Sequence, residues 1–188
     1  MADLLIDEKY NNSLDIEGFS RMMKDPSFCY KFYWLEAIVQ LISANKTQVS
    51  YDEIINEMIS NAWYSVLEFH LHLSGLFGDG LIKDNLEKAV IRLQGLSKLP
   101  NNASKIEIKN KLAEYVEDKE LRKYKMELTK KVPYKALSGF ANRSSKRIDL
   151  NSSAGRMMAY YNELNRSEIL LPYIFNDDNG LNRGIIFN

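Results

Sequence analysis

A repeated helix-start signal constrains the fold of this chain more than any other feature of its sequence. At three places a serine or aspartate is followed three residues later by a glutamate: Ser50 with Glu53, Asp84 with Glu87, and Ser104 with Glu107. In this pattern the two side chains can bond to backbone N–H groups of the first helical turn. Apolar residues then recur at spacings of three and four. We therefore expect a mainly α, bundle-like domain of about six to seven helices.

The first long apolar helix is expected to lie at the centre of this bundle. It follows Asp25-Pro26, a pair typical of an N-cap and the first helical position. Its apolar stripe is wide, which is typical of a central helix. The stripe consists of Phe28, Phe32, Leu35, Val39 and Ile42, and it is widened by Trp34, Ile38 and Leu41.

Further helices are expected along the chain. One runs from Ser50 to about residue 73, with Phe69 and Leu73 on its inner face, and others follow Asp84 and Ser104. A basic helix over residues 119–131 is stopped by Pro133. After a loop over residues 138–153, a last helix turns four apolar side chains inward: Met157, Tyr160, Tyr161 and Leu164.

The last twenty residues predict a β-hairpin. Two apolar runs, 170–175 and 183–187, flank a turn that contains Asn179-Gly180. We expect a helical domain over residues 1–168 and a hairpin appendage over residues 169–188. Because the last residues of the chain form an apolar predicted strand, we also expect a further C-terminal domain beyond it.

Composition excludes several classes of protein. The single cysteine, Cys29, excludes a disulfide framework and a zinc site built on paired thiolates. The N-terminal residues carry acidic groups where a signal peptide carries positive charge, and no apolar run is long enough to span a membrane. We therefore expect a cytoplasmic protein with no membrane partner.

The thiol and imidazole side chains do not indicate a catalytic site. His70 and His72 lie two residues apart, and on a helix this spacing separates them by about 200°, too far to chelate one ion together. We expect them in a helix-end or core role. Cys29 on the first apolar helix is expected to be buried and inert. A free-standing enzyme would need a pocket with convergent groups such as Glu68, His70 and His72.

Glycine and aspartate patterns are also interpreted as structural. Gly75, Gly78 and Gly80 do not match a phosphate-binding loop, and we expect them to end a helix and form a turn. Asp177 and Asp178 fall in the predicted hairpin turn, where aspartate favours turn geometry. We therefore assign no catalytic residue and no metal ligand to this chain.

The basic segment over residues 119–156 is the best functional candidate. It holds 11 Lys and Arg residues against 3 Asp and Glu residues, although the whole chain is neutral. Such a segment favours nucleic acid as a partner, because Lys and Arg neutralise phosphates. The candidate residues are Lys130, Lys131, Lys135, Arg143, Lys146 and Arg147, and Tyr134 and Phe140 lie among them as rings that could stack on bases. Alternatively, this segment is a solvated surface or the mate of the acidic first half.

Several motifs resemble those of bacterial HNH endonuclease domain-containing proteins. They are YKFYWLEAIVQLI (residues 30–42), WY (63–64), VPYKALS (132–138), LPYIF (171–175) and GIIFN (184–188). In that family the nuclease motif lies further toward the C-terminus, and it needs histidines that this chain lacks after His72. The resemblance implies a DNA-directed context such as restriction or phage defence. A divalent metal would belong to the missing nuclease part.

We therefore expect a non-catalytic accessory domain of an HNH-type endonuclease. The basic segment would contact DNA phosphates, which positions a protein without reading sequence. The alternative is an interaction or regulatory domain, in which an unpaired edge of the C-terminal hairpin binds a protein partner or a second copy.

Overall fold

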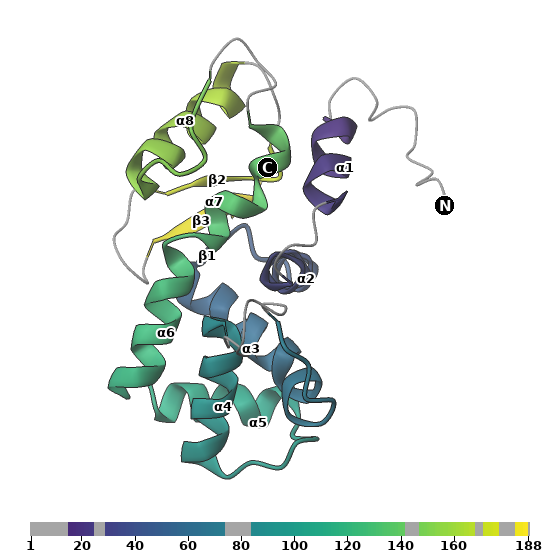
Figure 1. Ribbon diagram of the computed structural model, residues 1–188, viewed down its shortest axis with the longest axis vertical. Coiled ribbons are helices and arrows are strands. Elements are labelled where there is room, and N and C mark those ends of the chain that lie inside the picture. Colours follow the sequence, from purple (N-terminus) through teal and green to yellow (C-terminus); the bar gives the residue numbers. More distant parts are fainter. Residues whose placement is uncertain are drawn as a thin grey trace, which may run out of the picture.

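The computed structural model describes residues 15–24, 29–73, 84–141, 147–167, 171–176 and 183–187. Most of these residues are helical, which confirms the predicted mainly α fold (Figure 1). The helices are α1 (Ile16–Lys24), α2 (Tyr30–Ser43), α3 (Tyr51–Leu67), α4 (Asn85–Ser97), α5 (Lys105–Glu114), α6 (Lys119–Thr129), α7 (Val132–Ala136), the 3-10 helix η2 (Ser138–Phe140) and α8 (Ala154–Ser167). The strands are β1 (Gln48–Ser50), β2 (Tyr173–Phe175) and β3 (Gly184–Phe187).

The helices are arranged in two groups on either side of α2 (Figure 1). In the first group α3 packs against α2, α4 and α5. The second group contains α7, α8 and the sheet, with α7 against α2 and α8 against β2. Helix α6 joins the groups, since it packs against α4 and leads into α7.

The three helix starts predicted from the Ser/Asp-to-Glu spacing are confirmed, with one difference. The predicted start at Asp25-Pro26 lies outside the described residues, and the described helix α2 begins at Tyr30. Full capping boxes are present at the starts of α3 and α5. At α4 the Asp84 side chain accepts a hydrogen bond from the backbone N–H of Glu87 (2.7 Å). The Glu87 side chain does not return to the cap, because it is buried and its Oε1 lies 3.1 Å from Nδ1 of His72.

A buried tyrosine joins the sheet to two helices. The Tyr173 hydroxyl of β2 accepts a hydrogen bond from Nε1 of Trp34 on α2 (3.1 Å) and donates one to the carbonyl of Pro133 on α7 (2.7 Å). Burial raises the pKa of Tyr173 well above its ordinary value, so its hydroxyl stays protonated. The rings of Tyr51 and Tyr173 each meet Trp34 edge to face. Together these aromatic side chains form part of the contact between the two groups of helices.

The sheet is antiparallel, with β3 between β1 and β2. The pairing of β2 with β3 sets Ile174 opposite Ile186, which confirms that the two apolar runs pair. Strand β1, with Val49 opposite Ile185, was not predicted. The predicted turn with Asp177 and Asp178 lies outside the described residues.

The outer edge of β2 is bonded to α8. The Asn162 side chain accepts a hydrogen bond from the Phe175 N–H (2.9 Å) and donates one to the Phe175 carbonyl (3.0 Å). One turn further along α8, the Asn165 side chain accepts from the N–H of Leu171 (2.8 Å). Asn162 therefore takes the place of a neighbouring strand at Phe175, where a partner strand would otherwise bind.

Helix α2 turns only part of its predicted apolar stripe to the core. Trp34, Ala37 and Ile38 are buried, whereas Val39 and Ile42 of the predicted stripe are 61% and 46% exposed. Because α2 is apolar around most of its circumference, its periodicity does not select one side. The choice is made by α3 and α7, which both pack against this helix.

Helix α3 ends earlier than predicted, at Leu67. His70 has a left-handed backbone (φ 52°), a conformation typical of residues that end helices, so Phe69 is 64% exposed and not on an inner face. The prediction of a buried Cys29 was also wrong. This residue precedes the first turn of α2, and its side chain is exposed.

The role of Tyr173 predicts a contrast between two buried tyrosines. Tyr173→Phe removes the partner of both Trp34 Nε1 and the Pro133 carbonyl, so we expect a loss of about 1–3 kcal/mol in unfolding free energy. The Tyr161 hydroxyl is buried and has no hydrogen-bond partner among the described residues. Tyr161→Phe should therefore leave stability unchanged or raise it. Urea denaturation of both variants measures the difference, and equal losses would contradict the assignment.

Candidate nucleic-acid interface

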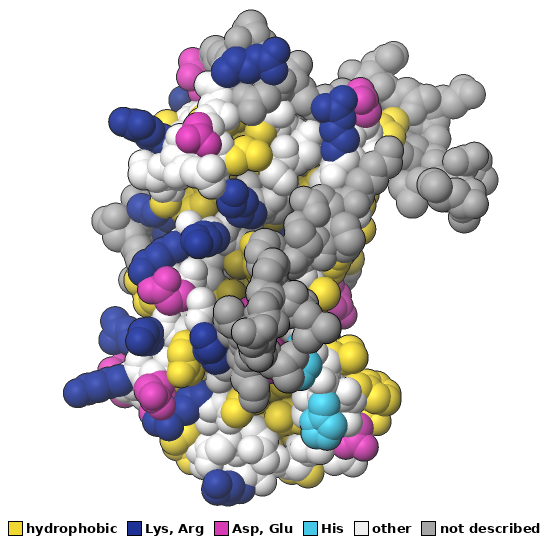
Figure 2. Space-filling view, viewed as in Figure 1, with side chains coloured by type: hydrophobic (Ala, Val, Ile, Leu, Met, Phe, Trp, Pro, Cys, Tyr) yellow, Lys and Arg dark blue, Asp and Glu magenta, His cyan; other side chains and the backbone are white. Residues whose placement is uncertain are grey.

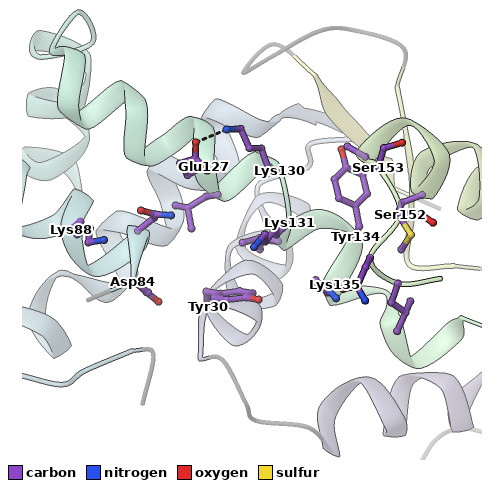
Figure 3. A pocket seen from close by; sticks show the side chains of 17 residues that line it. Tyr30, Asp84, Lys88, Glu127, Lys130, Lys131, Tyr134, Lys135, Ser152 and Ser153 are labelled. Atoms are coloured by element: carbon purple, nitrogen blue, oxygen red, sulfur yellow. Dashed lines mark hydrogen bonds and ion pairs between the residues drawn. The ribbon is translucent and has the colours of Figure 1, made fainter. Parts of the chain in front are cut away.

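A pocket of about 980 Å³ lies between the start of α4, the C-terminal end of α6, α7 and the start of α8 (Figure 3). We call it the lysine pocket, because four lysines line it. Its polar lining includes Lys88, Lys130, Lys131, Lys135, Asp84, Glu127, Tyr30, Tyr134, Ser152 and Ser153. In the close-up Lys88 and Asp84 lie on one side, Lys135, Ser152 and Ser153 on the other, and Lys131 between them.

The local fold explains why lysines gather here. Helix α6 ends at Thr129 and α7 begins at Val132, so Lys130 and Lys131 occupy the turn between two helices. Pro133 was predicted to end the basic helix, but α6 ends before it, at Thr129. Pro133 occupies the first turn of α7, where its missing N–H has no cost.

The apolar side of α7 holds the turn in place. Val132, Pro133, Tyr134 and Ala136 are buried against the core, while Lys131 stays exposed. The bond from Tyr173 to the Pro133 carbonyl fixes this short helix further.

Two of the four lysines have no carboxylate partner. Lys130 forms an ion pair with Glu127, three residues before it on α6. Lys88 lies beside Asp84 and interacts electrostatically with it. Among the described residues, Lys131 and Lys135 have no carboxylate partner, so the pocket presents two uncompensated positive charges.

A row of basic residues extends the lysine pocket along α6. Lys119, Lys123 and Lys130 recur at spacings of four and seven, so they share one side of the helix, which we call the α6 stripe. The opposite side holds the buried residues Leu121 and Leu128. The space-filling view shows Lys and Arg side chains gathered along the side formed by α6 and α8 (Figure 2).

The predicted binding residues are placed as follows. Lys130, Lys131 and Lys135 line the lysine pocket. Arg147 is exposed but does not line it. Arg143 and Lys146 lie outside the described residues. No sequence pattern indicated Lys88, which belongs to the acidic half of the chain and reaches the pocket only through the packing of α4 against α6.

The proposed stacking role of two aromatic residues is wrong. Tyr134 and Phe140 are both buried. Tyr134 packs against Phe175, with ring centroids 5.2 Å apart, and Phe140 belongs to the fully buried core. Both rings therefore stabilise the fold, and Tyr134, although it lines the lysine pocket, is only 3% exposed.

Ion pairs with the acidic half of the chain neutralise only some of the Lys and Arg residues in the basic segment. Lys125 is buried and forms an ion pair with Asp52 on α3. Arg122 lies 3.9 Å from Glu117 in the turn before α6. Lys131 and Lys135 have no such pair in the described part of the chain, so this alternative leaves the pocket unexplained.

The histidines do not form a convergent site. His70 is exposed, and His72 contacts Glu87. Glu68 accepts a hydrogen bond from Asn101 (3.1 Å), and neither this glutamate nor the two histidines line the lysine pocket. Across the described ranges, no group of three or more His, Cys, Asp or Glu side chains is arranged to hold a metal ion.

Comparisons with protein families, curated proteins and solved structures found no match for this chain. The resemblance to HNH endonuclease proteins therefore stays a prediction. Within the described residues, no helix is long and apolar enough to cross a membrane.

Two helix-capping aspartates have opposite electrostatic surroundings. Burial raises the pKa of Asp84, which lines the lysine pocket. A hydrogen bond from Arg92 lowers the pKa of Asp118, which caps α6. Ionisation of Asp84 therefore opposes folding, whereas ionisation of Asp118 favours it.

This difference predicts opposite pH dependences for two matched variants. Asparagine caps helices about as well as aspartate, so each substitution mainly removes a charge. Relative to wild type, Asp84→Asn should gain stability as pH rises above about 4, whereas Asp118→Asn should lose stability as pH rises toward about 4 and show no further change above it. Unfolding titrations at several pH values measure both trends. Parallel trends for the two variants would contradict the assignment of these two charges.

Proposed function

We propose that this chain is a non-catalytic nucleic-acid-binding domain that holds phosphate groups in the lysine pocket and along the α6 stripe. DNA is the expected ligand, because the sequence resembles HNH endonuclease proteins. In that context the domain would position DNA for a nuclease part located elsewhere in the protein.

One observation carries this proposal. Four lysines converge on one pocket, Lys88 from α4 and the others from residues 130–135, and two of them, Lys131 and Lys135, have no carboxylate partner among the described residues. Lysine ammonium groups donate hydrogen bonds and accept none, so such a pocket favours an anion. Phosphates are the anions that clusters of lysine bind in nucleic acids, with release of counterions.

The alternative role in protein binding has less support. It was based on an unpaired edge of the C-terminal hairpin, and at Phe175 that edge is bonded to Asn162. Strand addition at this position would require α8 to move. The apolar residues left exposed on α2 do not by themselves identify a partner.

The proposal predicts a charge-specific loss of DNA binding. In a fluorescence anisotropy titration at low salt, the double variant Lys131→Ala/Lys135→Ala should bind a labelled oligonucleotide at least about tenfold more weakly. The slope of log affinity against log salt should fall by about 0.7–0.9 for each phosphate that the variant no longer neutralises.

Lys46→Ala, compared with the single variant Lys131→Ala as well as with the double variant, is the control for the loss of one positive charge. Lys46 is exposed and follows the C-terminal end of α2, whereas Tyr30 at the N-terminal end of that helix lines the pocket. This variant should bind like wild type. An equal loss in the control and in the double variant, or no binding by wild type at low salt, would contradict the proposal.

A further inference from the structure

We propose that the lysine pocket receives the terminal phosphate monoester of a nucleic-acid strand, while the α6 stripe holds internal phosphates of the same strand. This inference rests on the proposed nucleic-acid function and assigns the pocket and the stripe to different groups of the ligand.

The shape of the site separates these two roles. A volume of about 980 Å³ lies at the upper end of the range of small-ligand pockets, about 300–1,000 Å³, so the site can enclose an end nucleotide. A double helix is too wide to enter such a pocket and can only lie across its mouth. Only a group that enters the pocket can contact all of the lysines that line it. The end of a strand is such a group.

The charge of the pocket fits a terminal phosphate better than an internal one. Lys131 from the turn after α6 and Lys135 from α7 contribute two positive charges without carboxylate partners among the described residues, and Lys88 from α4 adds a third that lies beside Asp84. A phosphate monoester carries a charge of about −1.5 to −2 near neutral pH, whereas each internal diester carries one negative charge. The monoester also offers three acceptor oxygens to these ammonium groups.

The wall opposite Lys88 supplies neutral donors. The residues Ser152 and Ser153 lie there beside Lys135 (Figure 3). Hydroxyl groups can donate to phosphate oxygens or to the sugar next to them. A ligand end that fills the pocket would thus meet Lys131, Lys135 and these hydroxyls, and the Lys88 and Asp84 side chains on the opposite wall.

Lys130 connects the pocket to the stripe. It lines the pocket and also shares one side of α6 with Lys119 and Lys123. The 11 residues of α6 span about 16 Å, which gives a strand leaving the pocket a basic path of that length.

The test compares single strands of one sequence by fluorescence anisotropy. One strand carries a 5′-phosphate, one a 3′-phosphate and one only hydroxyl ends. A fourth strand, with hydroxyl ends, is one nucleotide longer, so that its total charge is close to that of the phosphorylated strands. We expect one of the phosphorylated strands to bind about tenfold more tightly than both hydroxyl-ended strands, because it places the more highly charged monoester among three lysines.

Two variants separate the pocket from the stripe. Lys131→Ala should remove the preference for the phosphorylated end, because it weakens the binding of the phosphorylated strand more than that of hydroxyl-ended strands. Lys119→Ala/Lys123→Ala should weaken the binding of all strands to the same extent and leave the preference for the phosphorylated end unchanged. Both changes affect exposed side chains, and thermal unfolding of each variant verifies the fold.

The outcomes distinguish this inference from the proposed function. Equal affinity for all four strands would overturn the inference and leave nucleic-acid binding standing. No binding to any strand at low salt would overturn both. A nucleoside monophosphate that binds as tightly as the phosphorylated strand would show that the pocket takes a free nucleotide, which also overturns the assignment to a strand end.

Discussion

The Tyr173 hydroxyl makes the contact on which the arrangement of this fold depends. It joins α2, through Trp34, to α7, through the Pro133 carbonyl, and its own backbone belongs to the sheet. All of these groups are buried, so each would lose a hydrogen bond without gaining one from water. Because α7 carries Lys135 and follows the turn with Lys130 and Lys131, the same contact also positions the lysine pocket.

Local sequence signals predicted local structure well. The capping serines before α3 and α5 specify their own helix starts, and the apolar spacing of α8 places Tyr161 and Leu164 in the core. Features that depend on distant contacts were not predictable in this way. The inward side of α2 is chosen by its neighbours, and β1 exists only because β3 lies beside it.

In the candidate site, too, residues close in sequence were predictable and residues brought in by distant contacts were not. The basic segment indicated Lys130, Lys131 and Lys135, since neighbouring residues on one turn and helix stay close in any fold. Lys88 was missed, because α4 brings it to the pocket from a distant part of the sequence. Tyr134 was misinterpreted, because a ring among lysines can face either solvent or core, and α7 buries this one.

Binding of phosphate groups where these lysines converge can be measured directly. The measurement is an NMR titration of isotope-labelled protein with single-stranded DNA that carries a terminal phosphate. We expect the largest amide shift changes at Lys88, at residues 130–135 and at Ser152 and Ser153, with smaller changes along α6. Shift changes centred on α5 or on the sheet, or none at low salt, would contradict phosphate binding at this pocket.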